Sequence, residues 1–259
     1  MSPAADSAGQ SFEGRSFEPN PFAGDTGEAD RALIAALEAF HTNEVSREKR
    51  EELAEAVVDA LGAARILIPL IAHAGDYGLT DDGRVVEKTQ ELSVVHVEGP
   101  DGRPVAPVFS SVAALTAWKP DARPIPVDAA RAAIAAASDG LASMILDPGA
   151  KLAFSLRRGA LRCLAQSLPY VSAVRDQQVL EAIGLGVQAG GSAIESHTLR
   201  SGDPRRQMAG PEIVVDFVVK AGLDQAAITE LVAAMNEEWN AQPVIAERVD
   251  GLGVKLVSA

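Results

Sequence analysis

The sequence predicts a two-domain α/β (α+β) protein in which mixed or antiparallel sheets are covered by helices. Apolar residues recur every three or four positions in several segments, and short apolar runs of strand length lie between them. The chain has 259 residues, of which 47% are hydrophobic, enough for two ordinary cores. We expect a flexible N-terminal tail over 1–26, an α/β domain over 27–168 and a small α+β domain over 169–259.

Residues 1–26 predict a tail because Gly, Ser, Pro, Asn and Asp dominate and no apolar period is present. Phe12, Phe17 and Phe22 interrupt this composition at regular intervals. Five residues of extended chain span roughly 17 Å, so the rings could occupy successive pockets on a surface. Either that surface belongs to this chain and the tail wraps on its own body, or it belongs to a protein partner that orders the tail on docking.

Two amphipathic helices are expected next. Capping candidates lie between residues 25 and 30, and Gly62 is expected to end the second helix. The apolar positions are Leu33, Ile34, Leu37 and Phe40 in the first helix and Leu53, Val57, Val58 and Leu61 in the second.

Strands are expected over 65–71, 92–97 and 104–109, and the last two form a hairpin around Gly99-Pro100-Asp101-Gly102. The interval 73–90 is rich in Gly and Asp and predicts an exposed, mobile loop. The first domain then continues with a helix over 112–118 capped by Ser110 or Ser111, an alanine-rich helix opened by 126–128 and running to 137, strands over 144–146 and 151–156, and a helix over 157–167.

For the second domain the sequence predicts the element order α-β-β-α-β-β, which indicates a helical layer packed on an antiparallel sheet. The elements are helices over 177–187 and 224–239 and strands over 193–199, 213–219, 243–249 and 254–257.

Three motifs occur in order in the first domain. They are Pro107-Val108-Phe109-Ser110-Ser111, Trp118-Lys119-Pro120, and a strand that ends at Asp147-Pro148-Gly149. On these motifs the chain resembles the SseB (enhanced serine sensitivity protein B) family over roughly residues 30–150. The resemblance implies a bacterial protein with a second SseB-type domain in its C-terminal part and an auxiliary role around serine or sulfur amino-acid metabolism. It implies no agreed biochemical activity.

The motif residues have two interpretations. In the first, Phe109 fills the core, Trp118 covers it, and Asp147-Pro148-Gly149 shapes a turn. In the second, Ser110, Ser111, Trp118 and Asp147 meet at strand ends and line a recognition groove. Serine and aspartate without a histidine base are poor hydrolytic machinery, so we expect no catalytic residue.

Several function classes are disfavoured. The net charge of −13 repels nucleic acid and anionic membrane surfaces, and no apolar run of about 18 residues is present to span a bilayer. The sequence has no P-loop, His-Glu-x-x-His, Gly-x-Ser-x-Gly or Cys-x-x-Cys motif, and its four histidines lack ligand spacing, so neither a cofactor nor a metal is expected. The segment 184–189 spells a degenerate dinucleotide pattern without the required βαβ context.

The single cysteine, Cys163, excludes an internal disulfide and suits a reducing cytoplasm. Arg157, Arg158 and Arg162 lie near it in sequence and could lower a thiol pKa. Cysteine is also commonly buried, and we expect Cys163 to be a packing residue.

Between residues 151 and 206 the sequence has eight basic and four acidic residues, although the whole chain is strongly acidic. This basic segment either pairs with acidic helices of the same chain across the domain interface or binds an acidic partner or small anion. The anion-binding candidates are Arg157, Arg158, Arg200, Arg205 and Arg206.

The sequence therefore favours a non-catalytic, cytoplasmic protein-binding or regulatory module. Its partner is an unidentified protein, with self-association as a structural alternative. The runner-up is a small-anion sensor or enzyme that uses the basic segment.

Overall fold

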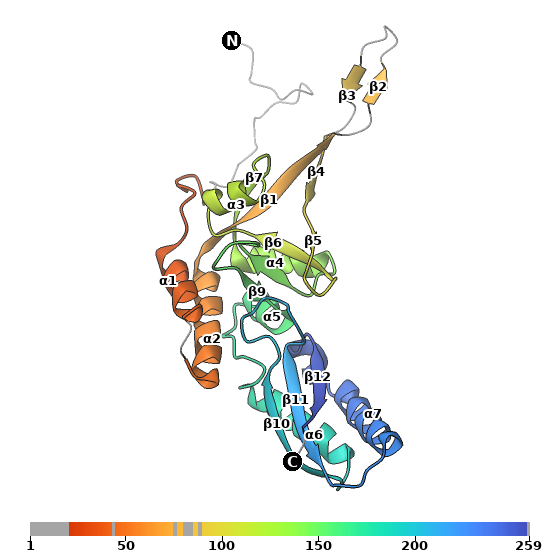
Figure 1. Ribbon diagram of the computed structural model, residues 1–259. Coiled ribbons are helices and arrows are strands. Elements are labelled where there is room, and N and C mark those ends of the chain that lie inside the picture. The colour runs from red at the N-terminus through yellow and green to blue at the C-terminus, as the bar shows by residue number, and fades with distance from the viewer. Residues whose placement is uncertain (1–20, 43–44, 75–76, 80–84, 88–89, 258–259) are drawn as a thin grey trace, which may run out of the picture.

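The computed structural model describes residues 21–42, 45–74, 77–79, 85–87 and 90–257, and it confirms the α/β class (Figure 1). The described residues form two large apolar cores and a smaller third one. One large core draws its buried residues from Leu33 to Tyr170, and the other from Ala173 to Val249. The third contains Leu67, Phe109 and Leu115. We call the parts before and after residue 170 the N-terminal and C-terminal halves; the exact domain boundaries stay a prediction.

Two helices form one side of the N-terminal half. In α1 (Arg31–Phe40) the predicted apolar stripe is buried, and the Asp30 carboxylate caps the helix by accepting the N–H of Ala32 at 2.8 Å. In α2 (Arg47–Ala63) the Ser46 hydroxyl accepts the N–H of Lys49 at 3.2 Å. The two helices pack together over the first core.

A three-stranded antiparallel sheet has the order β4-β1-β7. Its strands are β1 (Arg65–Ala74), β4 (Gln90–Val94) and β7 (Arg123–Asp128). The strand expected over 92–97 is split between β4 and β5 (Val97–Glu98). The alanine-rich helix expected to 137 is confirmed with Asp128 as its N-cap, but it begins only at Ala129, because Pro126 and Val127 belong to β7. The prolines of β7 are tolerated since it is an edge strand.

The second sheet has the order β5-β6-β8-β9, with β6 (Pro104–Val108), β8 (Met144–Leu146) and β9 (Phe154–Leu156). The β5–β6 hairpin is confirmed, whereas the strand expected over 151–156 forms only at its end. Leu67 and Phe109 exchange two backbone hydrogen bonds of 2.8 and 2.9 Å, which join the two sheets. Helices α3 (Val112–Trp118), α4 (Ala129–Ser138) and α5 (Arg158–Ala165) complete this half.

Within the interval expected to be a loop, β2 (Tyr77–Leu79) pairs with β3 (Val85–Glu87). This pair projects away from the body in Figure 1. Part of the loop predicted to be mobile lies outside the described residues, so its mobility stays a prediction.

The C-terminal half contains α6 (Gln177–Ala189), β10 (Ile194–Ser201), β11 (Ile213–Val219), α7 (Gln225–Ala241), α8 (Pro243–Arg248) and β12 (Leu252–Leu256). Its sheet, β10-β11-β12, is mixed: β10 and β11 are antiparallel, while β12 runs parallel to β11, so the expected purely antiparallel sheet is wrong. The strand expected over 243–249 is also wrong. Pro243 occupies the first position of α8, where a missing N–H costs nothing and the fixed φ suits a helix.

The two faces of this sheet differ. Ile213, Val215 and Phe217 of β11 point into the second core. Because side chains alternate along a strand, Asp216 points to the opposite face. Lys255 is paired with Asp216 in the register of β11 and β12 and therefore lies on the same face. This outer face meets the beginning of α2.

Candidate functional site

Ser110 and Asp147, predicted to meet at strand ends, are brought together by the ends of β6 and β8. The Ser110 hydroxyl donates to Asp147 Oδ2 at 2.6 Å, and the Ser110 N–H donates to Oδ1 at 2.8 Å. Ser110 is 3% exposed and Asp147 6% exposed. Burial raises the pKa of the Asp147 carboxyl, against the opposing effect of the two hydrogen bonds. Within the described part of the chain neither side chain bonds to a histidine. The pair joins the ends of β6 and β8 inside the protein, and a recognition groove at this place stays a prediction.

The other motif residues surround this pair. Phe109 is fully buried, and its ring centroid lies 5.1 Å from that of Trp118. Ser111 caps α3 by accepting the N–H of Ala114 at 3.1 Å. Pro148 and Gly149 form the turn after β8, where Gly149 has φ +81°, a value that favours glycine. Packing and turn formation account for these positions.

Arg206 of the basic segment crosses from the C-terminal half to the N-terminal half. Its guanidinium binds the Glu51 carboxylate of α2 and donates to the Ser172 hydroxyl at 3.2 Å. Its carbonyl accepts the N–H of Ser155 on β9 at 2.8 Å. Arg206 has φ +52°, a region unfavourable for residues that have a Cβ atom, and contacts at both its backbone and its side chain hold it there.

Arg157 joins the halves in the opposite direction. It is 2% exposed, and its guanidinium binds Asp203 at 2.7 Å and Asp250 at 3.2 Å. Asp250 also receives two hydrogen bonds from Arg103, of 2.6 and 2.9 Å. Arg157 and Arg206 are thus neutralised by carboxylates of their own chain across the interface between the halves. Both arginines are buried, so neither offers an accessible group to an anion.

The remaining candidates differ in their surroundings. Arg158 donates to the carbonyl of Ala246 at 2.8 Å, and Arg205 is exposed. Arg200 is held by Asp216 through two hydrogen bonds of 2.6 and 3.0 Å. Of the tail phenylalanines, Phe12 and Phe17 lie outside the described residues.

Phe22 is half-buried, and its carbonyl accepts the N–H of Asp25 at 3.0 Å. The Asp25 carboxylate pairs with Arg65 of β1 at 3.0 Å, and the N–H of Val112 donates to Gly27 at 2.8 Å. The chain from Asp25 onward is therefore attached to the body near α3.

A cavity of about 710 Å³ lies between the start of α2 and the outer face of the C-terminal sheet. We call it the junction cavity. Five basic and three acidic side chains line it, a formal excess of two positive charges. Its charged residues are Arg47, Arg50, Arg175, Arg200 and Lys255, with Glu48, Glu51 and Asp216.

Three of the cations converge on one carboxylate. The pKa of Asp216 is lowered first by its hydrogen bonds from Arg200 and further by the charges of Lys255 and Arg47. Arg47 and Lys255 make no ion pair within 4 Å among the described residues, and both are exposed. One carboxylate therefore faces three cations. This cluster, Arg47, Arg200, Asp216 and Lys255, is the cationic cluster of the junction cavity.

The backbone N–H groups at the start of α2 add little to this cluster. The Ser46 hydroxyl already accepts the N–H of Lys49 at 3.2 Å. The electrostatic character of the cavity therefore rests on its side chains.

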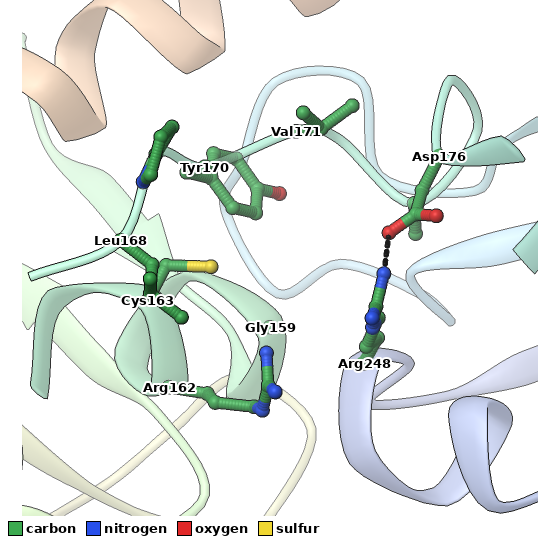
Figure 2. Close-up of a pocket in the computed structure, with 10 residues that line it drawn as sticks. Gly159, Arg162, Cys163, Leu168, Tyr170, Val171, Asp176 and Arg248 are labelled. Carbon is green, nitrogen blue, oxygen red and sulfur yellow. Dashed lines mark hydrogen bonds and ion pairs between the residues drawn. The ribbon is translucent and has the colours of Figure 1, made fainter. Parts of the chain in front are cut away.

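A second, smaller cavity of about 250 Å³ contains Cys163 (Figure 2). The sulfur faces the middle of the cavity, and the opposite wall carries the ion pair between Arg248 and Asp176, 2.7 Å long. Burial raises the pKa of the Cys163 thiol, outweighing the opposing charges of Arg162 and Arg248. A thiol of raised pKa is a weak nucleophile at neutral pH. This is the environment of a packing residue.

Within the described ranges, no group of three or more His, Cys, Asp and Glu side chains could hold a metal ion. No helix in the same ranges is long and apolar enough to cross a bilayer. The segment 184–189 lies inside α6 and forms no strand-to-helix turn.

Sequence reasoning missed Arg47 and Lys255 as members of the cluster. The sequence does carry one signal: Asp216 interrupts the apolar run of β11, and Lys255 interrupts that of β12, which places both away from the core. Nothing in the sequence indicates that α2 would close over this face.

A comparison of the sequence with protein-family models shows the family of this chain. The model described as SseB protein N-terminal domain matches residues 33–162. The chain belongs to the SseB family. The matched part runs from α1 into α5 and includes all three SseB motifs, but only the α2 wall of the junction cavity. A second SseB-type domain in the C-terminal half stays a prediction. No curated protein and no solved structure matched the chain.

Proposed function

We propose that this SseB family protein is a non-catalytic binding module whose ligand is anionic and occupies the junction cavity. The observation that carries the proposal is the placement of Arg47, Arg200 and Lys255 around the single carboxylate of Asp216 in the lining of one cavity. Cations gathered around one counter-charge repel one another, and an added anion relieves that repulsion. The positive excess is local, because the protein as a whole carries a charge of −13.

The buried contacts support binding over catalysis. Ser110 is bonded to Asp147 inside the protein, and the Cys163 thiol has a raised pKa. Neither side chain is therefore the activated nucleophile that covalent catalysis requires. A regulatory role in the cytoplasm, connected with serine or sulfur amino-acid metabolism, is the corresponding proposal at the level of the cell.

The cavity walls come from both halves, so an occupant contacts both. Glu48 and Arg47 belong to α2, whereas Arg200, Asp216 and Lys255 belong to the C-terminal sheet. A ligand that binds only the folded, assembled arrangement stabilises it by mass action. Thermal stability therefore reports binding.

The test measures the melting temperature of the full-length chain with phosphate, sulfate and succinate, against sodium chloride at equal ionic strength. We expect at least one anion to raise the melting temperature of the wild type but not that of the double variant Arg47→Gln/Lys255→Gln. The control is Lys119→Gln/Arg131→Gln. It removes the same charge from two residues away from the cavity, whose ion pairs with Asp121 and Asp128 are 3.9 Å long. An absence of any anion effect in the wild type, or an unchanged response in the cavity variant, contradicts the proposal.

A further inference from the structure

We infer that the ligand of the junction cavity is a small molecule that carries a single phosphate monoester; this inference rests on the anion-binding function proposed above. It goes further by specifying the charge, the shape and the size of the ligand. Each of these follows from a separate feature of the cavity.

The charge of the ligand follows from the charges that line the cavity. The lining has a formal excess of two positive charges. Arg175 is already paired with Glu55 at 2.9 Å, and Glu51 with Arg206. A phosphate monoester carries about −1.5 to −2 at pH 7, which matches this excess, whereas a monocarboxylate or a sulfate ester supplies only one charge.

The shape of the anionic group follows from the convergence of the cations. Arg200 holds Asp216 with two hydrogen bonds, Lys255 lies opposite Asp216 in the register of β11 and β12, and Arg47 lines the same cavity from the start of α2. The three cations are therefore grouped around Asp216. A compact dianion fits this arrangement better than a dicarboxylate. The planar guanidinium of arginine also matches phosphate through paired N–H donors.

The size of the ligand follows from the rest of the cavity. A volume of about 710 Å³ lies in the range of roughly 300–1,000 Å³ that holds small organic ligands, and it exceeds what one phosphate fills. Val45, Val174, Leu199 and Pro204 add apolar surface to the lining. We therefore expect an organic body attached to the phosphate.

The position of the cluster favours a small molecule over a phosphorylated protein segment. Asp216 belongs to β11, the central strand of the sheet, and its side chain lies on the outer face of the sheet. An extended peptide commonly binds by adding a strand to a sheet edge, whereas a ligand between Asp216 and α2 lies over the face of the sheet. The beginning of α2 closes the site from the other side.

The test is isothermal titration calorimetry on the full-length chain with four probes. Phenyl phosphate is the positive probe. Phenyl sulfate has a similar shape but one charge, succinate has two separated charges, and a phosphoserine-containing peptide carries the same group on a macromolecular backbone. We expect phenyl phosphate to bind at least tenfold more tightly than phenyl sulfate or succinate. Arg47→Gln and Lys255→Gln should each weaken it by about tenfold or more, as expected for hydrogen bonds to charged groups. Lys119→Gln should leave it unchanged.

The outcomes separate this inference from the proposed function. Equal affinity for the phosphate, the sulfate and succinate overturns the phosphate assignment while anion binding stands. Tighter binding of the phosphoserine peptide than of phenyl phosphate overturns the small-molecule assignment. If none of the probes binds, and no anion raises the melting temperature, both proposals fail together.

Discussion

Removing the charge of Arg206 should destabilise the protein strongly, and removing its partner as well should restore much of the loss. The side chains of Arg206 and Glu51 are only 4% and 6% exposed. In Arg206→Met the Glu51 carboxylate keeps the Ser172 hydroxyl but loses its counter-charge. Breaking a buried pair on one side typically costs about 3–5 kcal/mol, a large share of a total stability of about 5–15 kcal/mol. Replacing both partners with apolar residues of similar volume is often close to neutral.

The assay is urea unfolding of the wild type, Arg206→Met, Glu51→Leu and the double variant, which together form a double-mutant cycle. Arg131→Met is the control, because its side chain is 76% exposed and its nearest carboxylate is 3.9 Å away; its expected effect is within about 0.5 kcal/mol. The reasoning is refuted if Arg206→Met loses less than about 1 kcal/mol, or if the double variant is less stable than both single variants.

Three further predictions concern the motif residues and the cysteine. Because burial raises the pKa of Asp147 above its ordinary value of 3.8, this carboxyl contributes more stability in its protonated form; wild type should gain stability relative to Asp147→Asn as the pH falls from neutral toward that value, and urea midpoints at both ends test the direction. Phe109→Ala should cost about 3–5 kcal/mol in the same assay, since the ring is fully buried against Trp118; a cost near zero would contradict its core role. The Cys163 thiol, whose pKa burial raises above 9.0, should react with iodoacetamide more slowly than free cysteine at neutral pH, and a faster reaction would show an activated thiol.

The local chemistry of the sequence predicts much of the fold. The caps at Asp30 and Ser111 and the turn at Gly102 depend only on neighbouring residues, and the structure forms all three. Two errors have a common cause. The segments at 123–128 and 243–248 each contain proline, which suits an edge strand as well as the first turn of a helix. Whether such a segment becomes a strand or a helix depends on whether it lies at the edge of a sheet, which the local sequence does not show.

The candidate site was less accessible from sequence. The excess of basic residues in 151–206 correctly indicates an electrostatic role, but it cannot show which arginines meet carboxylates of their own chain. Arg206 finds Glu51 across 155 positions, and Arg157 finds Asp250 across 93. Arg200 stays in the junction cavity, where two cations from outside the basic segment join it. Such long-range juxtaposition depends on tertiary packing and leaves no local pattern.

The crossing of Arg206 into the N-terminal half also has a consequence during synthesis. Chains leave the ribosome from the N-terminus, and early domains generally fold first. The N-terminal half therefore emerges while Arg206, which lies 155 positions after Glu51, has not yet been synthesised. During that interval the Glu51 carboxylate has no counter-charge, and burying a carboxylate without one is costly. We therefore expect the surroundings of Glu51 to close only after the loop that carries Arg206 has been made.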